Sequence, residues 1–361
     1  TIENSAFYGC TALQSVEIPT TATTIGKSAF TGCTGELTLK VNVENRTSYT
    51  DGVFYGSKFS KVVIGNNVTA VGDYAFYGCK SIDSVVFGET VETVGNYSFY
   101  GCTSVTSLAI PQGVRRIGEA AFGGCSTLTE VIFADDSLLD IIDKDAFSGC
   151  SLLGYIHIPN GVRTLGDSAF SGCSSTTTVV VPASVNSIGE SVFKGCSGEL
   201  TLNVEVADAA SSTEGAFHGN NFTKVVIGSG VDHIGAYAFS DSNTIQSVEL
   251  CADIATIGDY AFNGCSALDA VTLPSGVTTI GNNAFSGCSA LTSLAIPQSV
   301  ETIGDEAFKS CYALTEFAFA EDALLSTIGD YAFSGCNLIT KIDIPAGVNT
   351  IGEGAFSGCS N

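Results

Sequence analysis

The stretch IGNNAFSGCSALTSLAIPQSV, residues 280–300, returns almost unchanged as VGNYSFYGCTSVTSLAIPQGV at residues 94–114. Its most regular feature is a phenylalanine, usually preceded by alanine and followed three residues later by cysteine. This marker recurs at residues 7, 30, 54, 76, 99, 122, 147, 170, 193, 217, 239, 262, 285, 308, 333 and 356. A unit of about 23 residues repeated along the whole chain indicates a repeat array, in which each unit packs on its neighbours.

Each unit combines an alternating apolar segment with a segment of small residues. One unit reads Leu268, Val271, Leu273, Pro274, Val277, Ile280, Gly281, Ala284, Phe285, Gly287 and Cys288. The alternation predicts a short strand that the proline ends, and Gly281 is expected to make a sharp bend. The Asp, Asn or Glu that commonly follows is expected to cap one helical turn carrying Ala-Phe.

One strand and one short helical turn per unit is the plan of a leucine-rich repeat. We therefore predict an α/β-type leucine-rich-repeat solenoid of about 15 coils of ~23 residues, with parallel strands on one face and short helical turns opposite.

A second, longer period is also present. GELTLKVNVE at 35–44 returns as GELTLNVEVA at 198–207, and FSKVVIG at 59–65 returns as FTKVVIG at 222–228, with the same offset in both cases. We interpret this as an internal duplication within a single array over 1–361. Because the two ends fall at nearly the same phase of the repeat, we expect a fragment of a longer surface protein.

The string I-G-x-x-A-F-x-x-C-x-x-L-x-x-V-x-I-P resembles the BspA-like class of leucine-rich repeats, over essentially the whole chain. The resemblance implies an extracellular, non-enzymatic array on the surface of a host-associated bacterium or protist. It also implies adhesion to host matrix proteins such as fibronectin and fibrinogen, or to other cells. No residue-level binding motif comes with the resemblance.

The acidic net charge excludes two classes of binding partner. With 14 Lys plus Arg against 37 Asp plus Glu, the net charge is −23, which repels nucleic acid and anionic lipid. No run of about 18 apolar residues is present, so we expect no direct membrane insertion. Protein partners fit this surface better, and the oligomeric state stays open.

Thirteen of the 14 cysteines stand three residues after a marker phenylalanine. This regularity favours a column of reduced, buried thiols over specific disulfides or a zinc site. Cys251 is the exception: it stands where most units have proline, which makes it the candidate exposed thiol, against the simpler reading of a small structural residue.

Few other residues are candidates for catalysis or metal binding. His157, His218 and His233 lie at different phases of the repeat, so no catalytic or metal-ligating set can be assembled around them, and we predict no enzyme, no cofactor and no metal. The acidic residue after each bend would stack from coil to coil, which calcium could bridge, although single N-caps explain the same composition.

The residue between the apolar positions of each predicted strand should point outward. Along the array this row is charged near both ends and apolar from Val63 to Ile132. The candidate ligand-binding residues, on what we take to be the inner face, are Val63, Val86, Ala109, Ile132, Tyr155 and His157. The alternative is ordinary β-propensity on a crowded face.

The sequence thus favours an extracellular or cell-surface protein-binding module, adhesive toward host matrix proteins or other cells. The alternative is a structural spacer or coat repeat with no specific ligand. A polysaccharide-active solenoid enzyme is a more remote alternative.

Overall fold

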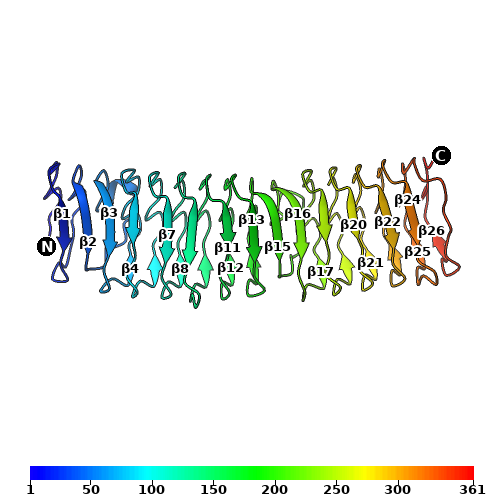
Figure 1. The fold of residues 1–361 in the computed structure, drawn as a ribbon, viewed down its shortest axis with the longest axis horizontal. Helices are drawn as coiled ribbons and strands as arrows, with labels where there is room; N and C mark the ends of the chain where they lie inside the picture. The colour runs from blue at the N-terminus through cyan, green and yellow to red at the C-terminus, as the bar shows by residue number, and fades with distance from the viewer. The chain divides into compact units, whose positions relative to one another are not determined.

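The computed structural model describes all residues, 1–361. Two compact units are present: unit 1 is residues 1–177 with 184–196, and unit 2 is residues 178–183 with 197–361. The single continuous array over 1–361 stays a prediction. Within each unit the coils follow one another side by side in chain order (Figure 1).

The predicted strands form the first set of strands, which are parallel. In unit 1 they are β1 (Ser15–Ile18), β2 (Thr34–Leu39), β3 (Lys58–Ile64), β5 (Ser84–Val86), β7 (Ser107–Ile110), β9 (Glu130–Phe133) and β11 (Tyr155–His157). In unit 2 they are β13 (Thr178–Val181), β15 (Ser197–Leu202), β16 (Asn221–Ile227), β18 (Ser247–Glu249), β20 (Ala270–Thr272), β22 (Ser293–Ile296) and β24 (Glu316–Phe319). Their apolar residues alternate inward, as the sequence predicted.

A second set of two-residue strands, which the sequence analysis missed, forms another parallel sheet in each unit. In unit 1 it holds β4 (Ala70–Val71), β6 (Thr93–Val94), β8 (Arg116–Ile117), β10 (Ile141–Ile142), β12 (Thr164–Leu165) and β14 (Ser187–Ile188). In unit 2 it holds β17 (His233–Ile234), β19 (Thr256–Ile257), β21 (Thr279–Ile280), β23 (Thr302–Ile303), β25 (Thr327–Ile328) and β26 (Thr350–Ile351).

The predicted short helical turns are wrong. The one helical segment is the 3-10 turn η1 (Tyr49–Asp51), and the Ala-Phe segments are instead successive tight turns. Between Gly72 and Cys79 alternate amides bond within the turn, for example Ala75 N to Gly72 O at 3.2 Å. The amides between them bond to the next coil, for example Phe76 N to Ser98 O at 2.7 Å. In an α-helix every backbone amide would bond to a carbonyl within the same segment. The positive φ of Tyr74 (58°) is also incompatible with a right-handed helix.

Where Asp or Asn follows the bend, this residue does not cap its own turn. Its side-chain oxygen accepts the backbone amide of the equivalent residue in the next coil, as in Asn96 N to Asp73 Oδ1 and Asp330 N to Asp305 Oδ1, both 2.7 Å. The link recurs in both units, and we call it the Asx ladder. The coil-to-coil stacking thus satisfies amides that the sequence analysis assigned to a helix cap.

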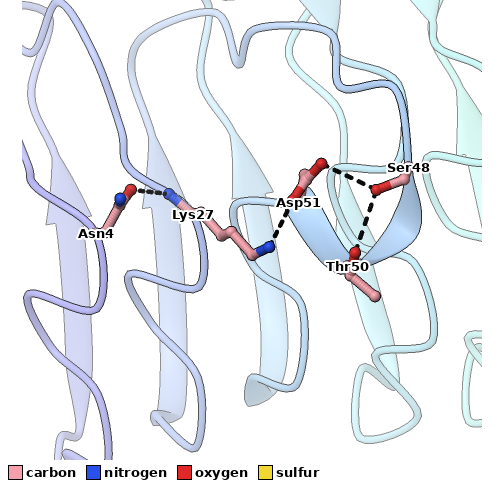
Figure 2. A network of polar contacts seen from close by, with 5 residues as sticks. All are labelled: Asn4, Lys27, Ser48, Thr50 and Asp51. Carbon is pink, nitrogen blue, oxygen red and sulfur yellow. Dashed lines mark hydrogen bonds and ion pairs between the residues drawn. The ribbon is translucent and has the colours of Figure 1, made fainter.

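Lys27 stands in one position of this ladder and links three coils (Figure 2). Its backbone amide donates to Asn4 Oδ1 at 2.8 Å, and its ammonium pairs with Asp51 Oδ1 of η1 at 2.7 Å. Ser48 donates to the other oxygen of Asp51 at 3.0 Å. The Lys27 ammonium and the Ser48 hydroxyl hold the pKa of the Asp51 carboxyl below its ordinary value.

The marker phenylalanines form the centre of the core. Their rings stack from coil to coil with centroids 5.0 Å apart for Phe76–Phe99 and 5.3 Å for Phe285–Phe308, nearly parallel in both cases. All four of these rings are fully buried. Full burial of one Phe side chain is worth roughly 1.5–3 kcal/mol, and only the next coil completes that burial.

Gly281 fits the coil for a reason other than the expected bend. Its φ is not positive, but a Cβ there would lie 2.7 Å from the backbone nitrogen of Asp259 in the preceding coil. The glycine therefore allows two backbones to approach closely. Gly287, which ends the turn with φ at 77°, stands where left-handed backbone geometry favours glycine, although Ser310 adopts it at the same position of the next coil with φ at 63°.

The two similar segments, residues 35–65 and 198–228, share one irregularity. The register between β2 and β3 shifts between Gly35 and Glu36, and the register between β15 and β16 shifts at the equivalent place in the second copy, between Gly198 and Glu199. In these coils the next segment lacks a two-residue strand, and in unit 1 it carries η1 instead.

The Asx ladder makes a prediction at Asp305. Asp305→Ala leaves the Asp330 amide without its acceptor, which we expect to cost about 1 kcal/mol and to raise hydrogen exchange at that amide roughly fivefold. Asp305→Asn keeps an acceptor oxygen and should change both quantities little. Exchange at Asp330 with urea unfolding measures them, and equal losses in both variants would show that charge, not the amide bond, matters.

Candidate functional site

The candidate site is the strand face of unit 1, defined as the outward side chains of β3, β5, β7, β9 and β11. All six predicted residues lie on it: Val63 in β3, Val86 in β5, Ala109 in β7, Ile132 in β9, and Tyr155 and His157 in β11. Val63 is half-buried and the other five are exposed, with Ile132 and Tyr155 each 52% exposed. Large apolar side chains are therefore presented to solvent on this face.

The structure brings the six together as three pairs. Val63 stands opposite Val86, and Ala109 stands opposite Ile132, in parallel register. The rings of Tyr155 and His157 stack with centroids 6.0 Å apart, because residues two apart in a strand point to the same side.

The hydrogen-bonded ladder of this face is interrupted between β9 and β11. The strands β7 and β9 form a two-stranded sheet by themselves, and a cavity of about 10 Å³ lies between β9 and β11, lined by Val131, Phe133, Ile156, Tyr155 and His157. The coil that begins with β9 is longer than most, and its extra loop exposes Leu138. The strand pairing is therefore interrupted on both sides of Ala109 and Ile132, between β5 and β7 and between β9 and β11.

Unit 2 carries a groove of about 510 Å³ on its own strand face, which the sequence analysis did not choose. Its lining includes the small outward residues Thr272, Ala295 and Ala318, together with Phe317 and Lys341. The volume falls in the range of small-ligand and peptide side-chain pockets. The signal was the run of small residues at successive outward positions, where no side chain fills the face.

A second feature that sequence reasoning missed is a tyrosine cluster on the turns of unit 1. Tyr74 stacks on Tyr97, and Tyr77 stacks on Tyr100, each with centroids 5.0 Å apart, while Tyr49 of η1 stacks on Tyr77 at 5.1 Å. Tyr97 donates its hydroxyl to Glu119 at 2.7 Å, and this carboxylate raises the pKa of the phenol. The available signal was the return of tyrosine at the same turn positions in neighbouring units.

The 14 cysteines are all free thiols. The regular buried thiols donate to the carbonyl of the marker phenylalanine one coil earlier, as in Cys79 Sγ to Phe54 O at 3.1 Å and Cys265 Sγ to Phe239 O at 3.2 Å. Where the column has Asn220 instead, its amide donates to Ser242 and to the Phe217 carbonyl. Burial raises the pKa of Cys125 to about 12.

Cys251 differs from this column. It is half-buried, and its sulfur lies 3.5 Å from the carbonyl oxygen of Val231. Cys10 and Cys359 are also half-buried, and all other cysteines are buried.

The three histidines have separate environments. His157 is exposed on the strand face of unit 1, and the others lie in unit 2, where the imidazole of His233 lies beside Glu205 and Asp232. The side chains paired with His233 are carboxylates, those of Asp232 and Glu205. The structure also has no helix with the length and apolar character to cross a membrane.

A family model described as the BspA type leucine-rich repeat region, in six copies, matches residues 1–129, 136–246 and 211–324. The chain belongs to this BspA-type family. A search of curated proteins found no match.

Among solved structures, a leucine-rich repeat protein from Bacteroides ovatus is similar at 22% identity, covering 99% of this chain and 80% of that one, with a TM-score of 0.47. A leucine-rich cell surface protein from Faecalibacterium prausnitzii is 22% identical, covering 87% and 90%, with a TM-score of 0.37. The pneumococcal vaccine antigen PcpA is 18% identical, covering 97% and 86%, with a TM-score of 0.43.

The thiol column makes a prediction about reactivity. Since the thiolate is the nucleophile, a raised pKa such as that of Cys125 keeps most of the buried thiols protonated at pH 8, and burial blocks the reagent at all of them. Iodoacetamide on the native chain should therefore modify Cys251, Cys10 and Cys359 and leave the buried thiols intact, as peptide mass spectrometry would show. In urea every cysteine should react, and even labelling of the native chain would contradict the buried column.

Proposed function

We propose that this BspA-type chain is an extracellular or cell-surface protein-binding module with an adhesive role toward host matrix proteins or other cells. The observation that carries the proposal is the exposure of Val86, Ile132 and Tyr155 on one strand face of unit 1. Exposed apolar and aromatic side chains on a rigid sheet are typical of interaction surfaces. The family is generally one of protein-binding, non-enzymatic arrays.

The surroundings of this face suit a protein partner. Polar and charged side chains flank it, including the ion pairs Lys61–Glu36 at 3.5 Å and Lys40–Glu17 at 2.7 Å. An apolar centre with a polar rim is the usual arrangement of a protein interface. A spacer needs no such apolar row, because reach comes from repetition alone.

Binding to fibronectin and fibrinogen tests the proposal, with the double variant Val86→Asp, Ile132→Asp beside the parent chain. Both substitutions place a charge on an exposed position, so the fold should remain, while apolar contact with a partner is lost. We expect the parent to bind and the double variant to bind at least tenfold more weakly by biolayer interferometry.

Two controls locate the surface. Tyr312→Asp changes a residue of equal exposure, 52%, on a turn of unit 2, and should leave binding unchanged. Ala295→Arg, Ala318→Arg fills the groove of unit 2 and distinguishes that groove from the strand face of unit 1. Undiminished binding by the Val86, Ile132 variant would reject this face, and no binding by the parent would favour the spacer.

A further inference from the structure

Three potential metal ligands meet on adjacent coils of unit 2, beside its second sheet. The isolated parallel bridge between Val206 and Ile234 brings Glu205 beside His233. His233 Nδ1 lies 3.0 Å from Asp232 Oδ1 and 3.8 Å from Glu205 Oε2, and one ligand atom from each residue lies within 4.8 Å of the others. The backbone pairing of two coils therefore sets this cluster, although Glu205 and His233 belong to different repeats.

The first copy of the duplication shows what the same positions do without such a cluster. At the offset that relates GELTLKVNVE to GELTLNVEVA, Glu205, Asp232 and His233 correspond to Asn42, Thr69 and Ala70. There the Asn42 amide links the two coils: its oxygen accepts the Thr69 amide at 2.8 Å and its nitrogen donates to the Thr69 hydroxyl at 3.0 Å. A neutral polar link thus occupies the place that two carboxylates and an imidazole occupy in unit 2.

The neighbouring ion pair of unit 1 is also absent from unit 2. Arg46 pairs with Glu44 at 3.6 Å, whereas the corresponding residues of unit 2 are Ala209 and Ala207. Glu205 and Asp232 therefore both face a single imidazole nitrogen, at 3.8 Å and 3.0 Å. Two close carboxylates favour a bound divalent cation over mutual repulsion.

We infer that Glu205, Asp232 and His233 form a binding site for a first-row divalent transition-metal ion, with Zn²⁺ as the expected occupant. One imidazole nitrogen and two carboxylate oxygens suit this class of ion better than Ca²⁺ or Mg²⁺, which take oxygen ligands. Metal–ligand bonds of about 2.0–2.2 Å place the ligand atoms roughly 3.0–3.5 Å apart. The 3.0 Å between His233 Nδ1 and Asp232 Oδ1 lies in this range, and Glu205 Oε2, at 3.8 Å from Nδ1, reaches it by a small side-chain movement. The two carboxylates are exposed and the imidazole is half-buried, so water has access to the remaining coordination positions.

The position of the site gives the ion a structural role. In the irregular coil of unit 2 a single bridge, Val206 to Ile234, replaces a two-residue strand. A metal bound to Glu205 on one coil and to Asp232 and His233 on the next ties the two coils together. It thereby does in unit 2 what the Asn42 amide does in unit 1.

Isothermal titration of the full chain with Zn²⁺ at pH 7, after alkylation of the accessible thiols, tests the site. We expect one equivalent to bind, and His233→Ala and Glu205→Gln each to weaken binding at least tenfold. Co²⁺ should give a spectrum without a thiolate charge-transfer band, which separates this cluster from the cysteines. Zinc should also slow hydrogen exchange in residues 203–210 of the parent chain but not of His233→Ala.

A transplant is the second arm of the test. Asn42→Glu, Thr69→Asp, Ala70→His places the same ligand set on the same backbone positions of the first copy, and a second equivalent should bind. The inference is overturned if the parent binds no zinc, or if His233→Ala and Glu205→Gln bind it as tightly as the parent.

Discussion

The backbone of each turn is satisfied only by the next coil, and the rest of the fold depends on this constraint. Alternate amides between Gly72 and Cys79 bond within the turn, and the amides between them bond across to residues 96–100. A coil without a neighbour would leave those groups unpaired, at a cost of roughly 1–3 kcal/mol for each buried one. Stacking is therefore obligatory, and the coil spacing is fixed by backbone hydrogen bonds.

That spacing explains why so few residue types recur at each position. Rings about 5 Å apart can stack face to face, so Phe76 and Phe99 fill the centre. A thiol is small enough to lie beside the column and donate to the carbonyl of a phenylalanine in the preceding coil, as Cys79 does. An Asp or Asn side chain has the length to reach the amide of the next coil, as Asp73 does for Asn96. These contacts between coils explain why the same residue types recur at the same positions of each repeat.

This also decides how much the sequence could predict. The period, the outward row and the buried column were predictable because they depend on which residue types fill a repeated space. The prediction of a helical turn at Ala-Phe was wrong because hydrogen bonds to the next coil outweigh the local helical preference. These bonds cannot be recognised in the sequence of a single unit. The two-residue strands, such as Thr279–Ile280, are too short for alternation to be visible.

The candidate sites follow the same division. Val86 and Ile132 were predictable as exposed because the strand period assigns every second side chain to the outside. The groove beside Ala318 arises because successive outward positions carry small side chains. A search for large exposed residues does not find such a groove. His233 seemed isolated because its partner Glu205 lies in the irregular coil, where the period that aligns residues breaks down.

The irregular coils are also where side chains can change without disrupting the regular contacts between coils. In a regular coil the Asx residue, the thiol and the phenylalanine are all engaged by the neighbouring coil, so a substitution there weakens the stack. In the coil of residues 203–218 the second strand is absent, and side chains supply the link between coils. An amide suffices at Asn42, but the same geometry accepts other groups that can bridge two coils. At these equivalent backbone positions one segment has the neutral Asn42 link, and the other has the carboxylates of Glu205 and Asp232 beside His233.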